Sequence, residues 1–259
     1  EFYPPLSMYG LTLAYWLSGA NAPLGLSLAF GLTLLVAAFG MFALARELYG
    51  EVGGLFATAA YVLSPTMLYH VFERGSLANA LALALFPWAA LALIRAVRVP
   101  EPRRLAWAAL LFGAVLLAHT AASLAFAVPL AALGLMVSFT MAQGHIRQRV
   151  LALVLALIGG LALAAFAWLP ALAEIQFTQY ATAITSPDVH YSRFFADVLR
   201  WPEPAIAGLN NPPLPVNVGL GQLVLGIAAS GLALAPLAAR RRAGEDWLTV
   251  AAGLLGLGT

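Results

Sequence analysis

A succession of apolar stretches, each of about 20 residues, constrains the fold more than any other feature of this sequence. Seven of these stretches are complete: 24–45, 53–72, 76–94, 104–120, 122–141, 150–171 and 218–239. An eighth begins near Trp247 and ends with the sequence, truncated. Because a helix of this length crosses a bilayer and satisfies its own backbone, the stretches predict an all-α fold, a polytopic transmembrane helical bundle.

The composition indicates that most of the chain is surrounded by lipid rather than by water. Of its 259 residues, 62% are hydrophobic and only 9% are charged, whereas a soluble domain carries about 25% charged residues. The chain has no cysteine, which excludes disulfides and thiolate metal sites. A net charge of +2 is too small to suggest nucleic acid as a partner, so none is predicted.

The basic residues indicate an orientation. All thirteen are arginine, and ten of them fall in alternate loops, leaving only Arg74, Arg193 and Arg200 in the other set. The positive-inside rule predicts that the arginine-rich loops face the cytoplasm. Residues 1–22 and the long loop 171–217 are then expected on the outer face.

Two segments on this outer face are predicted to lie along the membrane. Residues 1–22 contain a short apolar stretch bounded by proline and glycine, which favours an interfacial helix. Within the loop 171–217, residues 193–201 have an amphipathic pattern that predicts a second such helix. Residues 1–259 are expected to be one transmembrane domain. Because the sequence starts without methionine and ends inside an apolar run, we expect a piece of a longer protein.

The dipeptide Glu73-Arg74 lies between two apolar stretches. Charges in this position are costly unless they pair, contact water or bind a ligand. One interpretation is an ion pair that caps a helical hairpin. The other is a site in which Arg74 holds a phosphate and Glu73 acts as a base or metal ligand. His70 lies one turn earlier, and Asn79 is expected to hydrogen-bond back to the hairpin.

Two further candidates lie at predicted outer-face helix ends. Glu174 follows the apolar stretch 150–171, where it is either solvated or shares a cavity with Glu73. His119 lies between two apolar stretches and is either a structural histidine or part of the site.

The loop 171–217 contributes His190, Tyr191 and Arg193 as candidate substrate-binding residues. His190 and Asp188 are two potential ligands of a divalent cation, which is too few to predict a metal site. No phosphate-binding loop, dinucleotide fingerprint, zinc-protease motif or nucleophile elbow is present.

Four stretches together carry a family resemblance: 3–6, 72–82, 116–120 and 165–174. In their order the chain resembles bacterial integral membrane proteins described as 6-pyruvoyl-tetrahydropterin synthase-related. The resemblance covers most of residues 1–239 and implies a location in the bacterial inner membrane. Nothing in the sequence is similar to a soluble pterin enzyme.

That family in turn resembles the GT-C membrane glycosyltransferases, which use polyprenyl-phosphate sugars. The resemblance implies a GT-C-like bundle that transfers a sugar on the outer face, with membrane lipids and a polyprenyl-phosphate sugar as partners and a divalent cation as a candidate cofactor. Glu73 and Glu174 would be catalytic. The implied substrate-binding residues are Arg74, His70, Asn79, His119, His190, Tyr191 and Arg193. Asn79 departs from the family, which usually has an acidic residue there.

Two other functions remain open. The chain is alternatively a non-catalytic structural or accessory subunit of a larger respiratory or photosynthetic membrane complex. The absence of cysteine and the four histidines argue against its holding redox cofactors of its own. A transporter is the third interpretation, and the scarcity of polar residues inside the apolar stretches argues against it.

Overall fold

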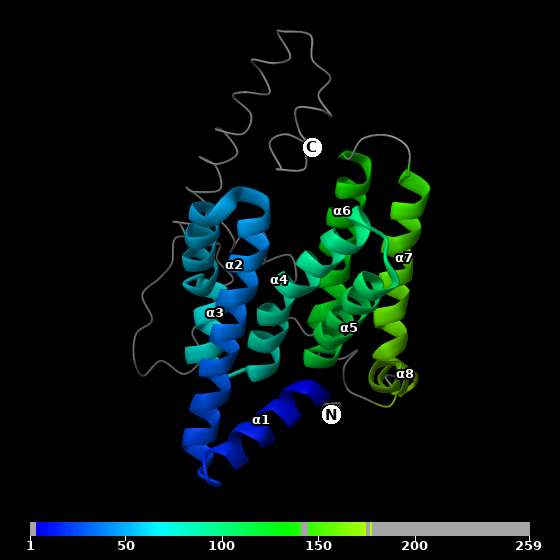
Figure 1. Ribbon diagram of the computed structural model, residues 1–259. Coiled ribbons are helices and arrows are strands. Elements are labelled where there is room, and N and C mark those ends of the chain that lie inside the picture. The colour runs from blue at the N-terminus through cyan, green and yellow to red at the C-terminus, as the bar shows by residue number, and fades with distance from the viewer. Residues whose placement is uncertain (1–3, 141–144, 175–176, 178–259) are drawn as a thin grey trace, which may run out of the picture.

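The computed structural model describes residues 4–140, 145–174 and 177 (Figure 1). Every element in this part of the chain is helical and none is a strand, which confirms the all-α class there. In chain order the elements are α1 (Pro5–Leu17), α2 (Ala22–Val62), α3 (Pro65–Leu68), the π-helical turn η1 (Tyr69–Glu73), α4 (Leu77–Arg98), α5 (Pro102–Ala118), α6 (Thr120–Thr140), α7 (Ile146–Leu163) and α8 (Ala165–Ala173). The predicted outer-loop helix and the apolar stretches from residue 218 onward lie outside the described residues.

Helix α2 is a hairpin of two arms. Gly50 has φ 78° and ψ −177°, which is not helical. In a straight helix Gly54 would lie about 18 Å along the axis from Phe42, but a Cβ on Gly54 would meet the Phe42 ring at 3.0 Å. The second arm (residues 51–62) therefore returns along the first (residues 22–49), as Figure 1 shows. The two arms agree with the prediction of two separate apolar stretches.

The prediction of one continuous helix over 53–72 is wrong. The second arm of α2 ends, and Ser64 begins a new helix by accepting a hydrogen bond from the Met67 N–H at 3.3 Å. Pro65 occupies the first helical position, where its missing N–H costs nothing. The chain then continues through α3 into η1 rather than crossing the bundle as one regular helix.

Helix α4 forms the centre of the bundle, between α2 and α5 in Figure 1. Its buried Ile94 and Val97 pack with Phe112 and Leu116 in the larger of two hydrophobic clusters. Helices α5 and α7 approach closely at Gly160, where a Cβ would lie 2.9 Å from a backbone oxygen of α5. Small residues permit such contacts between helices in lipid.

The prediction of one helix over 150–171 is also wrong. Helix α7 ends at Leu163, Ala164 has ψ 0°, and α8 turns away across the end of α7 (Figure 1). The break leaves the Leu161 carbonyl without its usual helical partner. The indole Nε1 of Trp168 donates to that carbonyl at 2.9 Å, so a side chain replaces the lost backbone donor.

The ends of the helices fall into two groups in Figure 1. The reversal at Gly50, the last turn of α4, the end of α6 and the start of α7 form what we call the Arg-rich end. Helices α1 and α8 and the start of α4 lie at the other end, which we call the Arg74 end. The Arg-rich end holds Arg46, Arg95, Arg98, Arg103, Arg104, Arg147 and Arg149.

Among the described residues, three helices are long and apolar enough to cross a membrane: α2, α4 and α7. This supports a helical membrane protein but not a particular number of spans. Helix α1 occupies the segment predicted to be interfacial, and its Tyr9, Leu13 and Trp16 are exposed. These side chains suit a position at the lipid headgroups, which stays a prediction.

Candidate functional site

The candidate site is built on the turn between η1 and α4. The Arg74 N–H donates to the Tyr69 carbonyl, and the Ser76 N–H donates to the His70 carbonyl, each at 2.8 Å. Between them Gly75 adopts φ 59°, a left-handed conformation that glycine adopts without strain. These bonds close η1 and redirect the chain into α4, so the turn has a defined geometry.

Both charged side chains of this turn are exposed. Glu73 and Arg74 are consecutive, yet neither forms an ion pair within the part of the chain that the structure describes. The capping ion pair, one of the two interpretations of this dipeptide, is therefore not formed there. The guanidinium and the carboxylate remain accessible to a ligand.

The structure brings His70 and His119 into the electrostatic field of Arg74. His70 belongs to η1 and His119 follows α5, so both lie outside the three helices suited to crossing a membrane. Burial, with help from Arg74 and His119, lowers the pKa of His70 to about 4. Burial also lowers the pKa of His119, against a backbone hydrogen bond that raises it, and Arg74 lowers it further. Both imidazoles are therefore neutral near pH 7.

His70 has an unsatisfied nitrogen. Its Nδ1 is buried and has no hydrogen-bond partner among the described residues, while its ring meets the Tyr69 ring edge-on with centroids 5.4 Å apart. Buried polar atoms nearly always have a partner, so an orphaned one at a turn suggests a ligand contact.

Asn79 behaves as the sequence predicted. Its Nδ2 donates to the Ser76 hydroxyl oxygen at 2.7 Å, which ties the first turn of α4 back to the hairpin. Ser76 in turn does not cap the first N–H groups of α4 with its own side chain. The positive end of the α4 dipole therefore adds to the positive charge of Arg74 at this turn.

The remaining predicted site residues do not join this group within the described residues. Glu174 is exposed at the end of α8, where its N–H donates to the Pro170 carbonyl at 2.9 Å. Helix α8 lies at the opposite edge of the bundle from α2 and α3 in Figure 1. His190, Tyr191 and Arg193 lie outside the described residues. Within the described residues, Asn79 and the Glu73-Arg74 dipeptide therefore share one turn, and Arg74 acts electrostatically on His70 and His119. Their role as a site stays a prediction.

A metal site finds no support in the described part of the chain, where no group of three or more His, Cys, Asp or Glu residues is close enough to hold an ion. Glu73 is the one carboxylate that the described residues place at this turn. One carboxylate is too few ligands for a cation held by the protein alone.

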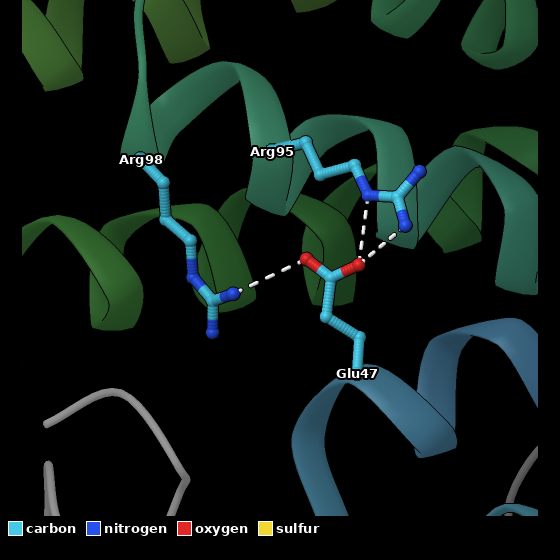
Figure 2. Close-up of polar contacts among 3 residues, drawn as sticks. All are labelled: Glu47, Arg95 and Arg98. Carbon is cyan, nitrogen blue, oxygen red and sulfur yellow. Dashed lines mark hydrogen bonds and ion pairs between the residues drawn. The ribbon is translucent and has the colours of Figure 1, made fainter. Parts of the chain in front are cut away.

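Sequence reasoning missed a polar cluster at the Arg-rich end (Figure 2). Glu47 accepts from Arg95 Nε at 2.8 Å and from Arg95 Nη2 through one oxygen, and from Arg98 Nη1 at 3.2 Å through the other. The only signal was that Arg95 and Arg98 are three residues apart and so lie on one face of α4. Their partner lies about 50 residues earlier in the chain, and no local pattern indicates that contact.

The helices and the charged turn together define an integral membrane protein. Residues 1–208 match the family described as "6-pyruvoyl-tetrahydropterin synthase related domain; membrane protein", and the chain belongs to this family. This confirms the first of the two resemblances. The comparisons with curated proteins and with solved structures found no match, so the resemblance to GT-C transferases stays a prediction from the sequence.

Proposed function

We propose that this chain binds the phosphate of a polyprenyl-phosphate sugar at the Arg74 end and is part of a GT-C-like glycosyltransferase. The observation that supports this most is the exposed Arg74, which has no carboxylate partner among the described residues. Its charge also helps to lower the pKa of His70 and of His119. A guanidinium that is not neutralised by the protein is available to an anionic ligand.

The chemistry of such a transfer suits these groups. When a sugar leaves a lipid phosphate, negative charge develops on the phosphate oxygens, and preorganised donors stabilise it. The planar fork of Arg74 binds two phosphate oxygens at once. Neutral His70 has a ring N–H that can donate to the phosphate, and the N-terminus of α4 adds its positive dipole. A phosphate therefore meets several donors at this turn.

Sugar transfer also needs a base for the acceptor hydroxyl. Glu73 is adjacent to Arg74 and exposed, so it can face an acceptor while Arg74 holds the phosphate. Glu174 is the second candidate, and it would act only if the ligand or the loop after α8 spans the distance between the two helix ends. No step of this proposal depends on a divalent cation.

Topology supports an outer-face reaction. The positive-inside rule assigns the Arg-rich end to the cytoplasm, so the Arg74 end faces outward in a multi-pass protein of the bacterial inner membrane. A polyprenyl-phosphate sugar has its phosphate at the lipid headgroups, which is where the turn between η1 and the start of α4 would lie. The exposed aromatic residues of α1 suit the same depth.

An accessory subunit of a larger membrane complex is the second candidate function. It is favoured by exposed large apolar side chains along α2 and α7, such as Phe39, Phe56 and Ile158. Either lipid or a neighbouring subunit could cover these side chains. The two proposals differ in whether the chain itself binds a lipid phosphate and transfers a sugar.

The test is transfer of a labelled sugar from polyprenyl phosphate by the reconstituted full-length protein, measured together with lipid-phosphate affinity. Arg74→Ala should weaken binding by about 1.5–3 kcal/mol, the range for hydrogen bonds to charged groups. Arg74→Lys should recover only part of this, because lysine lacks the fork. Glu73→Gln, and Glu174→Gln if that residue takes part, should lower turnover more than binding. Arg103→Ala at the other end is the matched control.

Affinity and turnover of Arg74→Ala equal to wild type would remove the proposed site. No transfer by the wild type across a broad panel of sugar donors, with lipid-phosphate binding also absent, would favour the accessory subunit.

A further inference from the structure

Glu47, Arg95 and Arg98, which we call the Glu47 cluster, carry a surplus positive charge at the Arg-rich end. Glu47 comes from the first arm of α2, and both arginines come from the last turn of α4 (Figure 2). Each carboxylate oxygen of Glu47 accepts from one of the arginines. One carboxylate neutralises only one of the two guanidinium groups, so the cluster keeps a formal charge of about +1.

Arg98 has a donor without a partner. Its side chain is only 21% exposed, and its Nη2 is buried and forms no hydrogen bond with the part of the chain that the structure describes. Figure 2 shows that Nη2 points away from Glu47, whereas Nη1 points toward it. Arginine stays charged in proteins and its buried N–H groups are normally bonded. The orphaned Nη2 therefore indicates that the cluster lacks one acceptor.

The position of the cluster at the end of an apolar helix suits the depth of lipid headgroups. Arg98 is the last residue of α4, an apolar helix long enough to cross a membrane. Tyr49 near the end of the first arm of α2 and Trp107 near the start of α5 are exposed, and such aromatic residues collect at the interface between lipid and water. Phosphate oxygens are the anionic acceptors that lipids offer at this depth.

We propose that Arg95 and Arg98, held in place by Glu47, bind the phosphate of an anionic phospholipid at the Arg-rich end. Arg95, whose side chain is 52% exposed, meets the phosphate first. Arg98 then turns its covered Nη2 outward to a second phosphate oxygen, while Glu47 keeps its bonds to Arg95. Because the cluster is already positive, a lipid with net negative charge binds better than a zwitterionic one. This proposal is independent of the site at Arg74.

The experiment uses the purified full-length protein in detergent and titrates it with phosphatidylglycerol or phosphatidylcholine, counting bound lipids by native mass spectrometry. The wild type should prefer phosphatidylglycerol. Arg98→Gln should reduce this preference about tenfold, the effect of one charge-assisted hydrogen bond. Arg98→Lys should retain part of the preference because it keeps the charge without the fork. Arg103→Gln, which removes an exposed arginine outside the cluster, should keep the preference.

Three results would overturn the proposal. The first is equal binding of both lipids by the wild type. The second is an equal loss in Arg103→Gln and Arg98→Gln, which would mean a diffuse effect of charge rather than a site. The third is displacement of the lipid by millimolar inorganic phosphate, which would mean a site for a free anion. If Arg98→Gln does not fold, Arg95→Gln tests the same site and should show a similar loss.

Discussion

Among the described residues, the two ends of the molecule differ in whether their carboxylates form ion pairs. Within the described residues, Glu47, Glu51 and Glu101 lie at the Arg-rich end and each forms an ion pair with arginine. Glu73 and Glu174 lie at the Arg74 end and form none there. Charges at the Arg-rich end partly hold helices together, whereas the described residues give Glu73 and Glu174 at the Arg74 end no ion-pair partner.

The ion pairs at the Arg-rich end are not equivalent. The Glu47 side chain is 21% exposed and joins two helices, while the Arg46–Glu51 pair is local to the α2 hairpin and is 56% and 72% exposed. Exposed pairs contribute little because water and salt screen them. Half-buried pairs matter more, mainly because loss of one partner leaves the other without a counter-charge. The loss of stability should therefore be larger when Glu47 is replaced than when Glu51 is replaced. Replacing a charge at the Arg74 end should cost little stability.

The largest expected effect on stability is at Glu47. Glu47→Gln leaves Arg95 and Arg98 without a carboxylate, and the free energy of unfolding should fall by about 1–3 kcal/mol. Glu51→Gln, the matched control, should change it by less than about 0.5 kcal/mol. Reversible unfolding of both variants in mixed micelles measures the difference. Equal losses of stability in the two variants would show that burial does not make the Glu47 ion pairs stronger than the Arg46–Glu51 pair. The proposed difference between the two ends of the molecule would then lack its main support.

A smaller effect is expected at Asn79. Asn79→Ala removes the hydrogen bond to Ser76 and should cost about 0.5–1.5 kcal/mol of stability. It should also weaken lipid-phosphate binding, because the turn that carries Arg74 loosens. Asn21 is a suitable control: it caps α2 at the same end by accepting from the Leu24 N–H at 3.1 Å.

Asn21→Ala should lose a similar amount of stability, about 1 kcal/mol, but leave lipid-phosphate affinity unchanged. The measurements are unfolding free energy and lipid-phosphate affinity for both variants. If both variants lose affinity equally, the turn has no special role and the effect is one of general stability.

The sequence predicted helices well where an apolar stretch begins and ends with a local signal. The stretch 76–94 corresponds to α4 (Leu77–Arg98), and 104–120 corresponds to α5 (Pro102–Ala118). Proline at the first helical position or arginine in the last turn marks one end of each. Length and end signals of this kind are local properties of the chain, so they can be read without the structure.

The two broken helices show where this reasoning stops. Ser64-Pro65 is a helix-start signal, but the apolar run around it hid the break. Ala164 carries no signal at all, because the break there is stabilised by Trp168 bonding back to Leu161 across the corner. A contact that exists only in the folded chain is not visible as a pattern of residues.

Some features of the candidate site could likewise be predicted from local sequence, whereas others depend on the fold. Arg74 and Asn79 were predicted, because charge between apolar stretches and spacing within one turn are local features. His119 was assigned to the same candidate site as His70 only through the family resemblance. The two are 49 positions apart in the sequence, and no local pattern indicates that the folded chain brings them within electrostatic reach of each other. The Glu47 cluster was missed for the same reason.

The smallest effect on stability, and the sharpest test of the comparison, is expected at the Arg74 end. Glu73 and Arg74 are exposed and form no ion pair among the described residues, so Glu73→Gln and Arg74→Ala should each change the free energy of unfolding by less than about 0.5 kcal/mol. Unfolding is measured as for Glu47→Gln. A loss comparable to that of Glu47→Gln would mean that the two charges hold the fold. Unchanged stability, together with loss of lipid-phosphate binding in Arg74→Ala, would mean that Arg74 contributes to ligand binding and not to the stability of the fold.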